Sequence, residues 1–287
     1  MSKIYCMSDI HGFYGAFAGR LEQLGELRGE DKLILLGDYI DYGSESGQVL
    51  RRIYELQQAL GDRCIVLRGN HEEMLLEWLD AYTGLQAGQV DEYGLRPWNP
   101  WLNTDPDFQT FHTLVTPEQW AFFRQVMPTL SEDSLNLTAV KMVLETNRDL
   151  IRWLRGLPYY HETEKQIFVH AGIDEEAGDW WRLGTPASTF VGKYPHIMGR
   201  FDKDIIAGHV GTYKLMGDPD FHGILWDGES HYFCDGTVSV SGNIPVLVYD
   251  TDTCKYYSLG GEGLRPVARC PENQAKKWKD SASEEWI

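Results

Sequence analysis

The feature that most constrains the fold is a pattern that repeats three times in the first seventy residues. An apolar run of strand length, at residues 4–7, 33–36 and 64–67, leads into a short loop containing Gly or Asp, and a helical period follows. In that period apolar residues recur at three- and four-residue steps, as on the buried face of a helix. This alternation predicts a βαβ architecture around a largely buried parallel sheet.

Strand patterns return in the second half of the chain. Apolar runs at 166–169 and 204–207 are followed by short runs spaced like antiparallel hairpins, at about 224–226, 232–234, 246–249 and 256–259. No linker divides the 287 residues, which lie near the upper size limit of one hydrophobic core. We therefore expect a single domain over residues 1–287, with a polar and mobile tail after about residue 269.

Between about residues 84 and 156 the strand pattern disappears, and this segment is interpreted as a helical insertion that caps the site. Thr116 followed by Pro117 and Gln119 predicts a helix that begins with a capping box. A second helix is expected to run through Val140 and Leu154 and to end near Gly156. The tryptophans of the segment, Trp98, Trp101, Trp120 and Trp153, could stack on a nucleotide base, but packing between helices is favoured.

Composition excludes several classes of function. The chain has 26 Lys and Arg against 43 Asp and Glu, a net charge of −17, so general nucleic-acid binding is not expected. No apolar run reaches the roughly 18 to 20 residues that cross a bilayer, and the chain opens into a strand pattern instead of a signal peptide. We expect no membrane association and a cytoplasmic location, in which the five cysteines are reduced and mostly buried.

Residues of the metal-binding type follow directly after the apolar runs. They are Asp9, His11, Asp38, Asp41, Asn70, His71, His170 and His209. Functional groups of α/β sheets gather beyond the carboxyl ends of the strands, so these side chains are expected to meet at one edge. Carboxylate and imidazole ligands suit Mn, Fe or Zn, and a shared Asp could bridge two divalent or mixed-valence ions.

In their order along the chain, D-x-H, GDYIDYG, RGNHE, H-A-G and G-H-V resemble the motifs of the calcineurin-like metallophosphoesterases. The chain most resembles their phosphoprotein (serine/threonine) phosphatase branch and its bacterial relatives. The resemblance covers roughly residues 3–83 and 157–250. It implies the four-layer α/β/β/α sandwich of that family, here with an unmatched helical insertion, and a dinuclear metal centre.

The resemblance also implies roles for single residues. One metal is held by Asp9, His11 and Asp38, and the second by Asp38, Asn70, His170 and His209, with a hydroxide between them that attacks phosphorus. His71 is the expected general acid, and Asp41 orients its imidazole. Glu72 and Arg68 are expected to be structural partners.

The chain departs from the family pattern at Tyr42, where the protein phosphatases have an arginine that grips phosphate. A phenol cannot replace the bidentate guanidinium on a dianionic phosphate. Arg182, or less favourably Arg200, is the candidate for the family's second phosphate-binding arginine.

Three functions are considered. The first is hydrolysis of phosphomonoesters of the serine/threonine phosphatase type, on a phosphoprotein or a small phosphoester. The alternative, motivated by Tyr42 and the Trp-rich insertion, is a hydrolase of dinucleoside polyphosphates such as diadenosine tetraphosphate, or a phosphodiesterase. The third, a non-catalytic interaction module stabilised by metal, is disfavoured because it has no need of His71 and Asp41.

Overall fold

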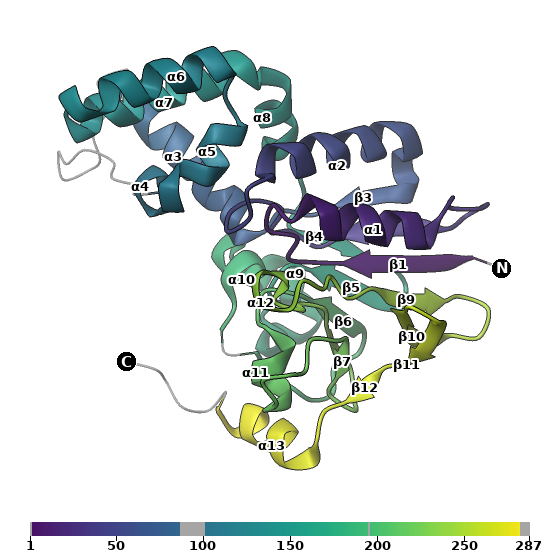
Figure 1. The fold of residues 1–287 in the computed structure, drawn as a ribbon. Coiled ribbons are helices and arrows are strands. Elements are labelled where there is room, and N and C mark those ends of the chain that lie inside the picture. Colours follow the sequence, from purple (N-terminus) through teal and green to yellow (C-terminus); the bar gives the residue numbers. More distant parts are fainter. Residues whose placement is uncertain (1, 87–100, 195, 282–287) are drawn as a thin grey trace.

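The computed structural model describes residues 2–86, 101–194 and 196–281, and its centre is a pair of six-stranded sheets (Figure 1). The first sheet has the order β11-β10-β9-β1-β2-β3. Its strands are β1 (Lys3–Met7), β2 (Lys32–Leu35), β3 (Cys64–Val66), β9 (Leu247–Asp250), β10 (Lys255–Gly260) and β11 (Gly263–Pro266). The three N-terminal strands are parallel, as their pattern predicted, and β9 joins β1 antiparallel, so both ends of the chain build this sheet.

The second sheet has the order β12-β7-β8-β6-β5-β4. Its strands are β4 (Tyr160–Glu162), β5 (Gln166–Val169), β6 (Asp204–Ala207), β7 (Leu225–Trp226), β8 (His231–Phe233) and β12 (Ala268–Arg269). The central strands β5, β6 and β8 are parallel. The short strands β4, β11 and β12 were not predicted.

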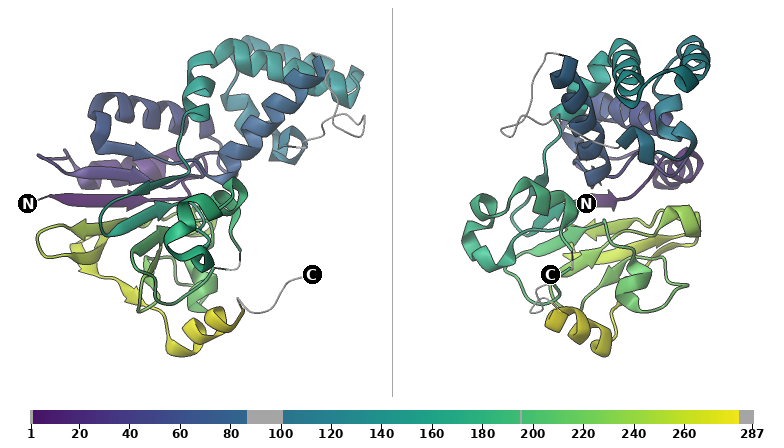
Figure 2. Two further views of the ribbon diagram at one scale, coloured as in Figure 1. Left: turned by 180° about the vertical axis from the view of Figure 1, so that it is seen from behind. Right: turned by 90° about the vertical axis from the view of Figure 1, so that its left-hand side faces the viewer.

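Apolar side chains from both sheets form the layer between them, including Cys6, Ile34, Phe168, Ile206 and Leu247. The outer face of the first sheet is covered by α1 (Tyr14–Leu24), α2 (Ser46–Leu60) and α3 (Asn70–Gln86). The outer face of the second sheet is covered by α9 (Trp181–Gly184), α10 (Ala187–Gly192), α11 (Thr212–Met216) and α13 (Glu272–Ser281). Figure 2 shows these four layers from two sides. The predicted α/β/β/α class is confirmed.

The described part of the insertion is helical and projects beyond the sheets beside α2 and α3 (Figure 1). It holds α4 (Trp101–Thr104), α5 (Gln109–Thr113), α6 (Pro117–Val126), α7 (Glu132–Thr146) and α8 (Arg148–Arg155). The predicted capping box is confirmed, since Thr116 and Gln119 exchange side-chain and backbone hydrogen bonds. The prediction of one continuous second helix is wrong. Asn147 separates α7 from α8 because its side-chain amide donates to the carbonyls of Val143 and Leu114.

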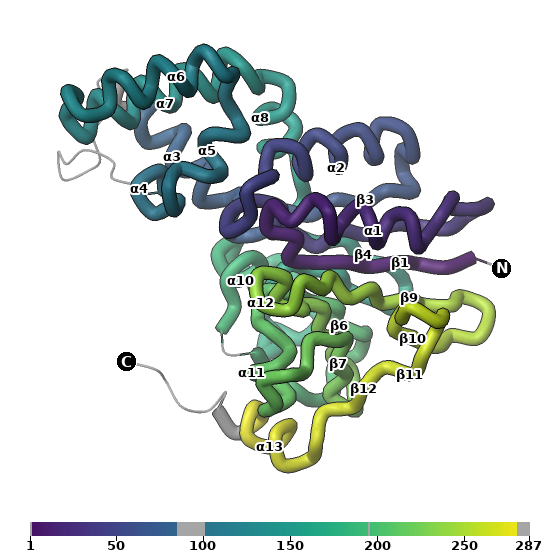
Figure 3. The backbone as a smooth tube through the Cα atoms, viewed as in Figure 1, coloured from purple at the N-terminus to yellow at the C-terminus, as the bar shows by residue number. Residues whose placement is uncertain are grey.

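The end of the chain also differs from expectation. Residues 272–281 form α13, which packs onto the second sheet, as the tube view in Figure 3 shows. Trp278 is buried there beside Leu215 and Phe233. The sequence pattern did not predict this helix, because its apolar face consists only of Ala275 and Trp278 and is surrounded by lysines and acidic residues.

Two further expectations concern cysteines and membranes. The cysteines are free, and Cys6, Cys64, Cys234 and Cys270 are buried while Cys254 is exposed. Within the described residues, no helix combines the length and the apolarity needed to cross a membrane.

Candidate metal centre

The loops that follow the parallel strands lie at one edge and are tied together by their backbones. Ile10 and His11, after β1, both donate a backbone N–H to the carbonyl of Asp38, after β2, at 2.8 and 2.9 Å. In the second sheet, Gly208 donates to the carbonyl of His170 at 2.8 Å. These bonds fix each loop against its neighbour, so the polar side chains on them have defined positions.

Six residues of these loops adopt left-handed backbone conformations, with φ between 47° and 70°. They are Asp9, His11, Asp38, Asp41, Tyr42 and His209. Such values are uncommon for residues other than glycine and cost of order 1–3 kcal/mol each in sparsely populated regions. A concentration of them at one edge marks a site whose geometry the surrounding structure enforces.

Glycine is required where two of these loops touch. Gly37 has φ of 119°, and a Cβ on it would lie 2.5 Å from the backbone nitrogen of Gly69. A side chain there would push the loop carrying Asp38 away from the loop carrying Asn70.

Asp38 lies at the centre of the edge and is buried. Its Oδ2 is 3.4 Å from His170 Nε2, 3.8 Å from His11 Nε2 and 3.9 Å from His71 Nε2. Burial alone would raise the pKa of Asp38, but the neighbouring imidazoles of His170 and His71 hold it well below its usual range. An ionised carboxylate among three imidazoles is suited to bridge two cations.

Asn70, at the start of α3, contacts histidines that follow strands of the second sheet. One terminal atom of its carboxamide lies 3.0 Å from His170 Nε2, 3.0 Å from His209 Nδ1 and 3.2 Å from Asp38 Oδ2. The two imidazole nitrogens and the carboxylate oxygen can each offer a lone pair at this point, and the carboxamide can present either its N–H₂ group or its oxygen there. Asp38, His170 and His209 are close enough to share a metal ion, and Asn70 lies against all three, so their role as ligands of a second metal stays a prediction.

A second group lies on the other side of Asp38. His11 directs Nδ1 to the carbonyl of Ile40 at 2.9 Å, which leaves Nε2 facing Asp9 Oδ1 and Asp38 Oδ2, each at 3.8 Å. The carboxylate of Asp9 also accepts the backbone N–H of His209 at 3.1 Å and so links the two sheets. The side chains close enough to share an ion on this side are His11, Asp38 and His71, while Asp9 lies beside His11, so the predicted set of Asp9, His11 and Asp38 stays a prediction.

His71 lies beside both groups. Its Nδ1 is 2.7 Å from Asp41 Oδ2, the contact expected of an orienting carboxylate. Burial lowers the pKa of His71, but the charge of Asp38 and the hydrogen bond to Asp41 outweigh it and raise the pKa to about 9. A raised pKa favours the protonated form of His71, which is the form that a general acid needs.

Glu72 and Arg68 act through the backbone. The buried carboxylate of Glu72 accepts the N–H groups of Asp38, Tyr39 and Gly69 at 2.9, 2.8 and 3.0 Å. Arg68 donates to the carbonyls of Leu154 and Arg155 at 3.2 and 2.7 Å. Both fit the structural role that the sequence suggested for them.

The groups surround a pocket of about 330 Å³. It is lined by Asp9, His11, Asp38, Tyr42, Asn70, His71, His209, Asp235, Thr237 and Ser239. The last three were missed. Asp235 comes shortly after strand β8, so the expectation that polar residues gather after the strands could have identified it. Burial raises the pKa of Asp235 to about 6.

Trp101 was also missed as a site residue. Its indole Nε1 donates to Asp41 Oδ2 at 3.2 Å, so the insertion reaches the His71–Asp41 pair through one hydrogen bond. The ring is buried against Trp78 and is not available to stack on a base. Trp120 and Trp153 pack against Phe123 and Tyr54, in line with the favoured interpretation, while Trp98 lies outside the described residues.

The prediction for Arg182 is not supported. Its guanidinium pairs with both carboxylate oxygens of Glu162 and lies over the ring of Trp181, and it does not line the metal pocket. Arg182 is satisfied on the outer surface of the second sheet. Arg200 is exposed and does not line the pocket either.

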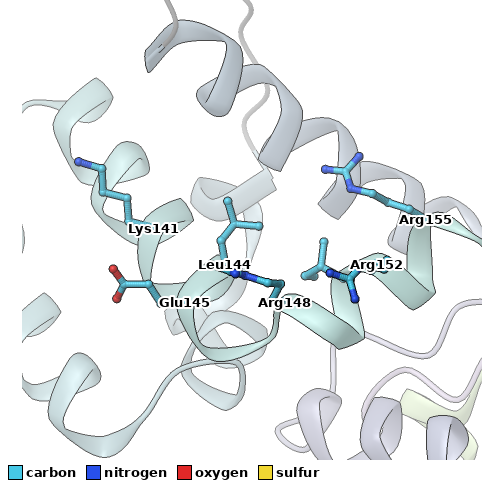
Figure 4. A pocket seen from close by; sticks show the side chains of 7 residues that line it. Lys141, Leu144, Glu145, Arg148, Arg152 and Arg155 are labelled. Carbon is cyan, nitrogen blue, oxygen red and sulfur yellow. The ribbon is translucent and has the colours of Figure 1, made fainter.

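Several Lys and Arg side chains lie together on helices α7 and α8 of the insertion. A cavity of about 490 Å³ is lined by Lys141, Leu144, Glu145, Arg148, Ile151, Arg152 and Arg155. Figure 4 shows the side chains around it. Arg155 pairs with Asp80 and Arg152 with Asp149. This cavity shares no lining residue with the metal pocket, so its basic side chains are not part of the metal centre.

Fold and site together define a class: a two-sheet α/β protein with a composite Asp, Asn and His centre at the carboxyl edge of its strands. Residues 2–249 match the calcineurin-like phosphoesterase family, and the chain belongs to that family.

Relatives within the family carry two kinds of name. A symmetrical bis(5'-nucleosyl)-tetraphosphatase of Nitrosococcus oceani is 24% identical over 222 residues, 77% of this chain and 60% of that protein. One of Aromatoleum aromaticum is 35% identical over 170 residues, 59% of this chain and 44% of that protein. This chain therefore matches less than two thirds of the length of either relative.

A protein serine/threonine phosphatase from Saccharomyces cerevisiae has the same fold. Its solved structure aligns with a TM-score of 0.51 at 15% identity and covers 94% of this chain and 82% of its own. At that identity the likeness concerns the fold alone.

Proposed function

We propose that this protein hydrolyses phosphoesters with two metal ions held by Asp9, His11, Asp38, Asn70, His170 and His209. One observation carries the proposal: the carboxylate of Asp38 and the carboxamide of Asn70 converge with nitrogens of His11, His170 and His209, beside His71. When bound, two such cations supply a water of lowered pKa and stabilise the charge of the phosphoryl group during in-line displacement. Mn, Fe and Zn all suit these ligands.

The residues of the chain divide the remaining work. Asp38 contacts expected ligands of both metals, His11 and His170, and Asn70 contacts His170 and His209 of the second. His71 holds a proton on Nε2, the nitrogen that faces the pocket, and donates it to the leaving oxygen. Asp41 accepts the hydrogen on Nδ1 and so keeps Nε2 directed into the pocket, and Trp101 donates to Asp41.

Two substrate classes fit this chemistry. Phosphomonoesters, on a phosphoprotein or a small molecule, are supported by the RGNHE and GDYIDYG loops that resemble the serine/threonine phosphatases. Dinucleoside polyphosphates are supported by a separate observation, that no Arg or Lys is among the described residues lining the pocket. The names of the bis(5'-nucleosyl)-tetraphosphatase relatives agree with the second class.

The test is turnover by the Mn²⁺-loaded chain of p-nitrophenyl phosphate, bis-p-nitrophenyl phosphate and diadenosine tetraphosphate. We expect at least one to be hydrolysed, with His71→Asn reducing turnover while metal content is unchanged. If the metal-loaded chain cleaves none of them, the proposed function is wrong and the interaction module becomes the better account. The cytoplasmic location expected from the sequence is a separate prediction, which cell fractionation tests.

A further inference from the structure

A group of basic side chains on the insertion contrasts with the charge of the whole chain. Residues 141–155 contain four basic and two acidic residues, whereas the whole chain has 26 Lys and Arg against 43 Asp and Glu. The four are Lys141 on α7 and Arg148, Arg152 and Arg155 on α8, and all are exposed. These four side chains are called the basic row below. Figure 4 shows Lys141 at one side of the cavity, Arg152 and Arg155 at the other, and Arg148 between them.

We propose that the basic row is a docking surface for an acidic segment of a polypeptide that binds in an extended conformation. This inference does not depend on the proposed function, because the basic row does not line the metal pocket. Arg155 pairs with Asp80 of α3, and α3 begins at Asn70. At the rise of an α-helix, Asp80 lies about 15 Å from Asn70, so the docking surface is separate from the metal centre.

Much of the charge in the basic row is not neutralised by the protein. Within the parts of the chain that the structure describes, Lys141 and Arg148 have no ion-pair partner. Glu145 is the one acidic residue among the described residues that line the cavity, and its carboxylate contacts the side-chain amide of Gln119 at 3.5 Å. Arg148 and Arg152 lie one turn apart on α8, a spacing at which like charges destabilise a helix. Helix stability therefore does not explain the basic row, whereas an anionic partner does.

The other two cations of the basic row form exposed ion pairs. Arg152 pairs with Asp149 at 2.9 Å, and Arg155 pairs with Asp80 at 2.6 Å. The side chains of Arg152 and Arg155 are 73% and 41% exposed. Exposed pairs of this kind add little stability, since water screens both charges. A carboxylate from a partner can therefore share these guanidinium groups at low cost.

The spacing of the cations favours an extended peptide over a single small anion. Arg148, Arg152 and Arg155 follow one another at steps of four and three residues, so they lie on one face of α8, each about 5 Å along the axis from the next. Alternate side chains of an extended peptide point to the same side and lie about 6.6 Å apart. Acidic residues at alternate positions can therefore meet successive arginines, whereas one phosphate ion contacts only part of the row.

The apolar residues of the cavity also fit a peptide. Leu144 and Ile151 line it together with the basic row, and Ile151 is buried. Their side chains offer a surface for the methylene groups of Glu, while the guanidinium groups bind the carboxylates. A nucleic acid also carries evenly spaced anions, but it would extend beyond the basic row over a molecule with a net charge of −17. A short acidic segment stays within the row.

The test measures the affinity of the Mn²⁺-loaded full chain for a short fluorescein-labelled peptide with Glu at alternate positions, by fluorescence anisotropy at low salt. The same peptide with Gln in place of Glu should bind much more weakly. Lys141→Gln and Arg148→Gln should each raise Kd about threefold to fivefold, the effect of one exposed charge pair, and the double variant about tenfold. Arg124→Gln is the matched control, because it removes an exposed charge from α6 of the same insertion, outside the cavity. It should leave Kd unchanged.

Three results would overturn the inference. The first is equal binding of the Glu and Gln peptides by the wild type, and the second is wild-type affinity in the double variant. The third is tighter binding of an oligothymidylate of equal charge that is weakened by the same variants, which would make the basic row a nucleic-acid site. Removal of the metal should leave the affinity for the Glu peptide unchanged, so a failure of the proposed function does not affect this test.

Discussion

Opposite ends of strand β8 carry two buried clusters of histidine and carboxylate that look alike by residue type. At its start, His231 Nδ1 lies 3.1 Å from Asp227 Oδ2 and Nε2 lies 3.5 Å from Glu175 Oε1, which also pairs with Lys193. Beyond its other end, Asp235 lines the metal pocket. The first cluster balances its charges with protein groups, whereas the pocket turns lone pairs toward a shared point.

This difference separates a structural ion cluster from a metal centre. The carboxylate of Asp227 accepts N–H groups from Gly199, Glu229 and His231, so nothing is left for a ligand. Around Asn70, by contrast, two imidazole nitrogens and a carboxylate oxygen meet the end of one carboxamide. The residue types do not separate a structural ion cluster from a metal centre, but the hydrogen-bond partners of their polar atoms do.

The largest expected effect is at Asp38, the residue shared by both metal groups. Asp38→Asn removes the bridging charge, so both cations should be lost and turnover should fall at least about 10⁴-fold. Metal content after gel filtration and kcat with excess Mn²⁺ measure this. If Asp38→Asn keeps both metals and its activity, Asp38 does not bridge a metal centre, and the contrast between the two clusters is wrong.

The next effect is at His71. His71→Asn should lower kcat about 10²- to 10⁴-fold with both metals retained, because it removes the proton donor and no expected ligand. The wild-type rate should fall as pH rises through the pKa of His71, and this basic limb should disappear in the variant. Equal losses of metal and of rate would show instead that His71 is a ligand.

Changes in the cluster of His231, Asp227 and Glu175 should alter the stability of the fold and leave metal binding unchanged. Asp227 and Glu175 outweigh the effect of burial and raise the pKa of His231 to about 9, from about 6.5 for an unfolded histidine. The stabilisation is therefore fully present below about pH 6.5 and is lost as pH rises through about 9.

His231→Gln should accordingly cost about 3 kcal/mol at pH 6 and much less at pH 10, by denaturant unfolding of the metal-free chain. Activity per folded molecule should not change. A loss of bound metal in this variant would show that the two clusters are not independent.

The smallest expected effect is at Trp101. Trp101→Phe keeps the packing against Trp78 and removes one hydrogen bond to Asp41, which is worth about 1 kcal/mol. We expect kcat to fall about threefold to tenfold and the basic limb of the pH profile to move, with KM and metal content unchanged. An unchanged pH profile would confine Trp101 to packing.

How much the sequence could predict depended on distance along the chain. Asp9, Asp38 and Asn70 each follow their own strand within a few residues, so the local pattern is sufficient to predict that they meet at one edge. His170 and His209 obey the same rule in the second sheet.

The failures involve partners that no local pattern connects. Trp101 meets Asp41 from 60 residues away, and Arg182 pairs with Glu162 on β4, a strand that was not predicted. The break at Asn147 depends on the carbonyl of Leu114, which lies in another part of the insertion. Helix α13 was hidden because it needs the second sheet to bury Trp278.

The central claim is that Asp38 joins two metal groups into one centre. Metal content of the purified chain, titrated with Mn²⁺ and measured by elemental analysis, tests it most directly. The account predicts two ions per chain for the wild type and for His231→Gln, and none retained by Asp38→Asn. One ion per chain in the wild type, or two ions retained by Asp38→Asn, would contradict it.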